Sequence, residues 1–226
     1  MSQTFVEILA KFNRKERYYL LGMALGNPTF AISQEFTNIL QRAFPDRGID
    51  FSEARFVAMD YHIDWIYASL CLCTKAPPIA ILENGIHLYP RDNRLQCITA
   101  TQQDIDLVIA FGDLSGPALT HFIMLEAKGA TGWTNFQLQE KAKRLEVIFG
   151  SDGKEWKDIV APYFAILSPK KPSDRLSTSG FPEFMKPNGQ LTWLEMSMPS
   201  GLQKVTLCDE NGRDCQDGPL WKVETH

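Results

Sequence analysis

Two short apolar runs in the middle of the chain constrain its fold most strongly. Ile105 to Phe111 is rich in branched residues and is stopped by Gly112, and His121 to Leu125 is a similar run stopped by Gly129. Runs of this length bounded by glycine are typical of buried strands rather than of helices. The loop between them contains glycine and proline, which is the composition of a turn. We therefore predict two neighbouring strands joined as a hairpin.

Acidic residues lie at the open end of this predicted hairpin. Side chains alternate along a strand, so Asp104 and Asp106 share one face, and Glu126 and Lys128 share one face. In the expected register Asp106 lies beside Glu126. Two carboxylates on adjacent strands are hard oxygen ligands of the kind that Mg²⁺ or Mn²⁺ prefers. The pattern predicts that Asp106 and Glu126 bind such an ion.

The lysine beside these acids indicates the chemistry. An ion at Asp106 and Glu126 can activate a water molecule and stabilise charge on a phosphate. Lys128 adds a positive charge toward the nucleophile or the scissile phosphate. The other acid-x-lysine triplets, at 152–154 and 155–157, neither end an apolar strand nor follow an acid-headed one. We predict phosphodiester cleavage, and the alternative is a solvated ion pair across two strands.

This arrangement resembles the PD-(D/E)xK nuclease superfamily over roughly residues 56–168. The family core is a helix, a three-stranded meander, a crossover helix and a fourth strand. The resemblance implies an α/β fold, with a restriction-endonuclease-like mixed β-sheet flanked by helices. It also implies that Asp106 is the motif acid of the second strand, and that Glu126 and Lys128 are the acid and lysine of the third. Ile105 stands where the family motif has a proline, which many members of the family lack.

A charged amphipathic helix is predicted directly after the lysine strand. Gln137, Lys141 and Arg144 follow one another at spacings of four and three, so they share a helix face. We expect Gln137 and Lys141 to face the phosphates beside Lys128, with Lys141 and Arg144 contacting nucleic acid. The alternatives are that Gln137 only completes a capping box with Thr134 and that the basic side chains are solvated.

A further acid is expected from a helix that precedes the sheet. Apolar residues at steps of three and four predict this helix from about Ser52, with a buried stripe at Phe56, Met59, Ile63, Ile66, Tyr67 and Leu70. Asp60 and Asp64 lie one turn apart along its border. The resemblance implies an acid here that completes the metal site, and Asp64 is preferred over Asp60. The other reading is that both are ordinary surface acids.

The remaining segments predict one domain with three parts. Helices are expected at 5–12, at 17–25 and from a Ser33 cap to Pro45, so residues 1–76 form a helical N-terminal part. Residues 79–168 form the nuclease-like core, whose first strand lies at 79–82, 85–89 or 95–100 and whose fourth lies at 163–167. Residues 169–226 form a loop and a C-terminal β extension, with strands expected at 191–196, 202–207 and 220–223.

Composition limits the function classes. The chain has 226 residues, 44% of them hydrophobic, and a net charge of −4, whereas a protein that only coats nucleic acid is more basic. No run approaches the length of a membrane helix, so we expect a soluble cytoplasmic protein without a membrane partner. The five cysteines show no C-x-x-C pair, which disfavours a zinc site.

These observations favour a Mg²⁺- or Mn²⁺-dependent deoxyribonuclease of the restriction or repair type, with DNA as its partner. The alternative is a catalytically inactive module of the same fold that binds protein or nucleic acid. A homodimer is compatible with the sequence, although no residue demonstrates one.

Overall fold

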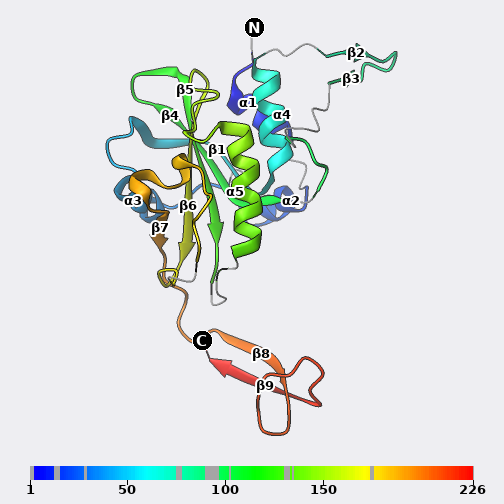
Figure 1. Ribbon diagram of the computed structural model, residues 1–226, viewed down its shortest axis with the longest axis vertical. Helices are drawn as coiled ribbons and strands as arrows, with labels where there is room; N and C mark the ends of the chain where they lie inside the picture. The colour runs from blue at the N-terminus through cyan, green and yellow to red at the C-terminus, as the bar shows by residue number, and fades with distance from the viewer. Residues whose placement is uncertain are drawn as a thin grey trace.

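The protein is an α/β structure built around a five-stranded mixed sheet (Figure 1). The computed structural model describes residues 3–12, 16–27, 30–74, 78–89, 97–101, 103–129, 133, 135–173 and 176–225. In spatial order the strands are β1 (Ile49–His62), β4 (Asp104–Asp113), β5 (Gly116–Ala127), β6 (Val160–Ser168) and β7 (Thr192–Glu195).

The strand directions divide this sheet into two halves. β1, β4 and β5 pair antiparallel, whereas β5, β6 and β7 pair parallel. Helix α5 (Asn135–Phe149) connects β5 to β6 and supplies the crossover that parallel neighbours require. The predicted hairpin, the crossover helix and the parallel strand after it are therefore confirmed.

Helices cover both faces of the sheet. On one face, α5 packs with α1 (Phe5–Phe12) and α4 (Ile63–Cys73) over the even-numbered apolar residues of β4, β5 and β6. On the other face, α3 (Gln34–Ala43) packs over the odd-numbered residues of the same strands. All three strands are thus buried on both sides, which explains why the sequence shows continuous apolar runs there.

The N-terminal helices begin and end close to their predicted positions. α1 spans Phe5–Phe12, and α2 spans Glu16–Ala24. Ser33 caps α3, because its side-chain oxygen accepts a hydrogen bond of 3.1 Å from the backbone N–H of Phe36.

The predicted helix from Ser52 to Leu70 is wrong in its first half. Residues 49–62 form β1, the edge strand beside β4, and the helix begins only at Ile63. The pairing of β1 with β4 shifts register between Asp50 and Ala54 and again between Ala54 and Phe56. Both shifts precede Phe56, and the pairing is regular from there to His62. This stretch is apolar on both faces, with Val57 in one core cluster and Ala58 and Tyr61 in the other, so its sequence lacks the alternation of a strand and its apolar residues coincide with helical steps.

Strand β1 also corrects the predicted division of the chain. It supplies the first strand of the meander, so residues 1–76 are not purely helical. The segment expected to hold that strand forms a separate hairpin, β2 (Ala80–Ile81) with β3 (His87–Leu88). Residues 97–101 contain no strand, and residues 90–96 lie outside the described part of the chain.

The C-terminal segment divides between the central sheet and an appended hairpin. β7 extends the sheet beside β6, whereas β8 (Gln203–Cys208) and β9 (Leu220–Thr225) pair only with each other. Figure 1 shows this hairpin projecting away from the sheet. Among the helices that can be described, none has the length and apolar composition needed to cross a membrane.

Candidate active site

The β4–β5 register brings the predicted acid pair together. Leu107 pairs with Leu125, so Asp106 and Glu126 are the next residues toward the open end of the hairpin. Both lie on the face covered by α5, because each is two residues from a core residue of that face, Val108 or Met124. The negative charge of Asp106 acts on Glu126 and raises the pKa of its carboxyl, which is already raised by burial.

A backbone hydrogen bond orients Asp106. The N–H of Ala127 donates to Asp106 Oδ2 at 2.7 Å, and the Asp106 side chain is half-buried. This bond joins the start of β4 to the end of β5, where the regular ladder of the hairpin has ended. Asp106 is thus held against the strand that carries Glu126.

Glu126 is buried and bound by a cation from the helix above it. Only 5% of its surface is exposed, and Lys141 Nζ donates to Glu126 Oε1 at 2.6 Å. Burial raises the pKa of Glu126 to about 7, and the attraction of Lys141 opposes that rise without cancelling it. Glu126 therefore changes its charge near neutral pH.

The raised pKa of Glu126 predicts how stability depends on pH. A carboxyl whose pKa rises on folding stabilises the fold below its ordinary pKa, and the stabilisation disappears as pH rises through the folded value. The free energy of unfolding should therefore fall, by an amount on the order of 3 kcal/mol, between pH 4.5 and pH 7. Urea unfolding at a series of pH values measures this. Glu126→Gln should remove the slope in that window, and an unchanged slope in that variant would contradict the assignment.

Lys128 is the first residue after β5, two positions beyond Glu126, and its backbone N–H donates to Leu167 O of β6 at 2.9 Å. Its side chain is half-buried, and within the described residues its ammonium group makes no ion pair. Backbone pairing thus fixes the main chain at Lys128, while none of the described acids neutralises its charge.

Asp64 and Arg144 form a buried ion pair with each other, which corrects two expectations. Arg144 Nη2 donates to Asp64 Oδ1, and the two residues are 7% and 8% exposed, respectively. The backbone N–H groups of Ala100 and Thr99 also donate to the Asp64 carboxylate, at 2.8 and 3.2 Å. Although burial raises the pKa of Asp64, these hydrogen bonds and Arg144 outweigh it, so the pKa is lowered overall.

These contacts give Asp64 and Arg144 a structural role. Arg144 also donates to Gln103 Oε1 at 3.0 Å and to Cys97 O at 3.3 Å. A guanidinium engaged in this way is turned into the protein, which corrects the prediction that Arg144 contacts nucleic acid. Asp64 is not a surface acid, and among the described residues it does not join Asp106 and Glu126 in a three-ligand metal group. It ties α4 to α5 and to the segment at 97–103.

The other residues predicted on helices lie in different surroundings. Lys141 does lie above the acid pair, but it contacts Glu126 rather than an open surface. Gln137 is exposed on α5 one turn before Lys141, and its role stays a prediction. Thr134, the expected capping partner of Gln137, lies outside the described residues. Asp60, the alternative helix acid, lies instead on β1 with a positive φ of 46°.

The acid pair fits a small, hard cation. Mg²⁺ is commonly held by one or two carboxylates, with water and substrate phosphate as its other ligands. Among the residues that can be described, no group of three or more His, Cys, Asp or Glu side chains could hold a metal. Asp106 and Glu126 could thus offer two carboxylates to Mg²⁺ or Mn²⁺, with the remaining ligands supplied from outside the described residues.

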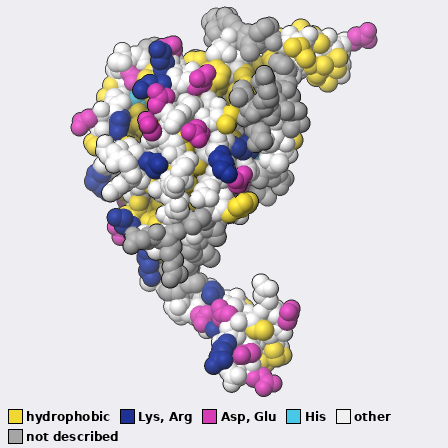
Figure 2. Space-filling view, in the orientation of Figure 1, with side chains coloured by type: hydrophobic (Ala, Val, Ile, Leu, Met, Phe, Trp, Pro, Cys, Tyr) yellow, Lys and Arg dark blue, Asp and Glu magenta, His cyan; other side chains and the backbone are white. Residues whose placement is uncertain are grey.

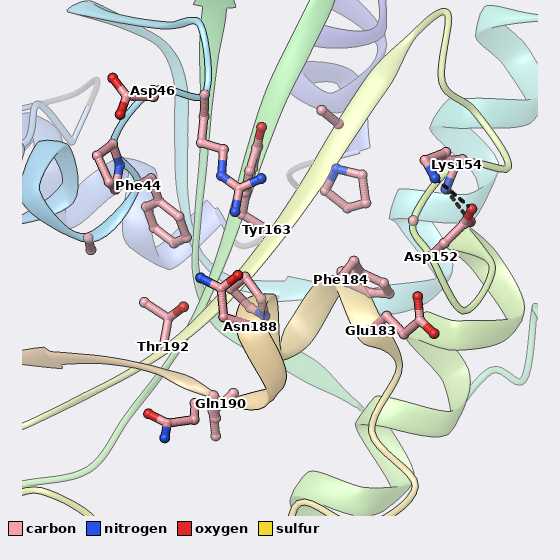
Figure 3. Close-up of a pocket in the computed structure, with 18 residues that line it drawn as sticks. Phe44, Asp46, Asp152, Lys154, Tyr163, Glu183, Phe184, Asn188, Gln190 and Thr192 are labelled. Carbon is pink, nitrogen blue, oxygen red and sulfur yellow. Dashed lines mark hydrogen bonds and ion pairs between the residues drawn. The ribbon is translucent and has the colours of Figure 1, made fainter.

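A separate hollow lies along the start of β6. It measures about 1090 Å³ and lies between the end of α3, β6 and two short 3₁₀ turns, η1 (Glu183–Met185) and η2 (Pro187–Gly189). Figure 3 shows Phe44 and Tyr163 on one side of it and Phe184 on another. None of the predicted site residues lines this hollow.

A buried polar chain next to the hollow was missed by sequence reasoning. His121, which is 2% exposed, bonds through Nδ1 to the Tyr163 hydroxyl at 3.0 Å and through Nε2 to Asp113 Oδ2 at 2.7 Å. Hydrogen bonds from Ser115 and His121 lower the pKa of Asp113 to about 2. The pairing of β5 with β6 creates the chain, so sequence spacing alone carried no signal for it.

Comparison of the chain with protein-family models, with curated proteins and with solved structures found no match.

Proposed function

We propose that the protein is a metal-dependent nuclease that hydrolyses phosphodiester bonds of DNA, of the restriction or repair type. One observation carries the proposal. Asp106 and Glu126 are neighbours on antiparallel strands, and Lys128 follows two positions beyond Glu126, directly after β5. Two hard oxygen ligands at one sheet end, together with an ammonium group that no described acid neutralises, suit the binding and cleavage of a phosphodiester.

The arrangement of elements gives further support. An antiparallel meander, then a crossover helix, then a parallel strand is the order expected of a PD-(D/E)xK core, and β1, β4, β5, α5 and β6 follow it. The chain departs from the plain pattern by inserting α4 and the β2–β3 hairpin between the first two strands of the meander.

The residues take distinct roles in the proposed reaction. Asp106 and Glu126 hold Mg²⁺ or Mn²⁺, which supplies Lewis-acid activation of water and of the phosphate. Lys128 orients the attacking water and offsets charge on the scissile phosphate. On α5, Lys141 contacts Glu126, and the exposed Gln137 lies one turn before Lys141. Helix α5 thus forms the wall of the site that faces the sheet.

The charge distribution agrees with an enzyme better than with a coating protein. The net charge is −4, and Figure 2 shows Lys and Arg mixed with Asp and Glu over the visible face rather than gathered in one basic stripe. A metal ion at the acid pair would reverse the local sign where phosphate must bind.

A catalytically inactive module of the same fold is the second candidate. The tight bond between Lys141 and Glu126 favours it, because an ammonium group already neutralises one of the two ligands. An inactive module would bind protein or nucleic acid without needing a metal.

Cleavage assays separate the two candidates. Supercoiled plasmid and linear single-stranded DNA are incubated with Mg²⁺, with Mn²⁺ or with EDTA, alongside the Asp106→Asn variant and RNA of the same length. We expect cleavage of DNA with either ion, none with EDTA, and none by the variant. Cleavage that persists in EDTA, or equal cleavage by Asp106→Asn, would contradict the proposal.

A further inference from the structure

The contact between Lys141 and Glu126 carries an inference about how the metal site is loaded. Lys141 Nζ lies 2.6 Å from Glu126 Oε1, and the two side chains are 15% and 7% exposed. Both residues are held by rigid elements. Glu126 follows the buried strand residues of β5, and Leu138, Ala142 and Leu145 fix α5 in the core around Lys141.

The ammonium group of Lys141 offsets the unfavourable electrostatics of the acid pair. Asp106 and Glu126 repel each other, and Glu126 is almost completely removed from water. The ammonium group of Lys141 is the partner that the fold provides for the buried acid. A divalent cation bound by Glu126 would approach the same carboxylate, where its charge and that of Lys141 would repel strongly.

We propose that Lys141 is the built-in counterion of this acid pair and is exchanged for the divalent cation when the site is loaded. The inference rests on the proposed function. The exchange leaves the Lys141 ammonium without its carboxylate, at the sheet end where Lys128 already lies without an ion pair among the described residues. Two ammonium groups then become free for substrate phosphate, so metal loading and phosphate binding are coupled.

The test is calorimetric titration with Mn²⁺ alone at pH 8, in two buffers of different ionisation enthalpy, so that affinities are corrected for protons released by Glu126, whose pKa would rise further without Lys141. The proteins are the wild type, Lys141→Met, Lys141→Gln, Lys141→Arg and the control Lys143→Met. Lys143 lies two positions along α5, is exposed and pairs with Glu140. Loss of the competing charge should tighten Mn²⁺ binding by about tenfold in the Met and Gln variants. The Arg variant and the control should stay within about twofold of the wild type.

The outcomes distinguish the inference from the proposed function. If Lys141→Met and Lys141→Gln bind Mn²⁺ with unchanged or weaker affinity, Lys141 is not a counterion that the metal displaces, while the metal site itself stands. If none of the five proteins binds Mn²⁺ at millimolar concentration, the proposed nuclease site falls as well. If only Lys141→Met and Lys141→Gln bound Mn²⁺, the result would support both the exchange of Lys141 for metal and the proposed metal site.

The coupling between metal loading and phosphate binding is measured separately. The affinity for a duplex oligonucleotide is measured with and without Ca²⁺, which has the same oxygen-ligand chemistry. We expect Ca²⁺ to strengthen wild-type binding, and this gain should shrink by about fivefold or more in Lys141→Gln, because one phosphate-binding charge is absent. A full Ca²⁺-dependent gain in that variant would overturn the second half of the inference.

Discussion

Lys128→Ala should abolish metal-dependent DNA cleavage while leaving the protein folded. Lys128 makes no ion pair within the described residues, and its contribution to the sheet is a backbone hydrogen bond to Leu167 that alanine retains. In the proposed reaction its ammonium group orients water and stabilises phosphate charge. Removing one such group lowers enzymatic rates by about 10²–10⁴-fold.

Initial cleavage rates at saturating Mg²⁺ measure this loss, and thermal unfolding monitors the fold. Lys143→Ala is the matched control, because its exposed side chain lies on α5 outside the acid pair and pairs with Glu140. The control should cleave at the wild-type rate. Full activity in Lys128→Ala would remove Lys128 from the mechanism.

Breaking the Asp64–Arg144 pair should cause the largest loss of stability. Asp64→Ala leaves a guanidinium that is 7% exposed without its acid partner, and it removes the acceptor for the N–H groups of Thr99 and Ala100. Removal of one partner from a buried pair costs about 3–5 kcal/mol. Chemical unfolding of Asp64→Ala and of Arg144→Met should each show a decrease of this size.

The double variant tests whether the loss comes from the pair itself. Asp64→Ala combined with Arg144→Met removes both charges, so its stability should exceed the value obtained by adding the two single losses. Additive losses would show that the two residues act independently. Below its melting temperature, Asp64→Ala should also retain metal-dependent cleavage, because the Asp64 carboxylate is bound by Arg144 and forms no three-ligand group with Asp106 and Glu126 among the described residues. If a folded Asp64→Ala protein no longer bound Mn²⁺, Asp64 would be a metal ligand, as the sequence first suggested.

The sequence predicted the elements whose patterns are local. Glycine-bounded apolar runs were sufficient for β4 and β5, and the amphipathic segment with a strand after it was sufficient for α5 and β6. β1 was predicted as a helix because residues 56–62 carry apolar side chains on both faces of the sheet, so they lack the regular alternation from which a strand is recognised in a sequence.

The candidate site also contains features that a local sequence pattern predicts and features that it does not. The hairpin register brings Asp106 beside Glu126 as the two-residue period of a strand predicts, whereas Lys128 lies just beyond β5 and its shared face with Glu126 stays a prediction. The bond between Asp64 and Arg144 joins residues 80 positions apart, and it depends on how α4 and α5 pack. No local pattern encodes such a contact, so both residues were expected in the wrong surroundings.

A crystal of the protein soaked in Mn²⁺ and measured at the manganese absorption edge tests the central claim most directly. We expect an anomalous peak roughly 2.0–2.5 Å from a carboxylate oxygen of both Asp106 and Glu126, with the Lys141 ammonium moved away from Glu126. The absence of a peak at this pair in millimolar Mn²⁺, with Lys141 still bound to Glu126, would contradict the claim that these residues form a metal-dependent active site.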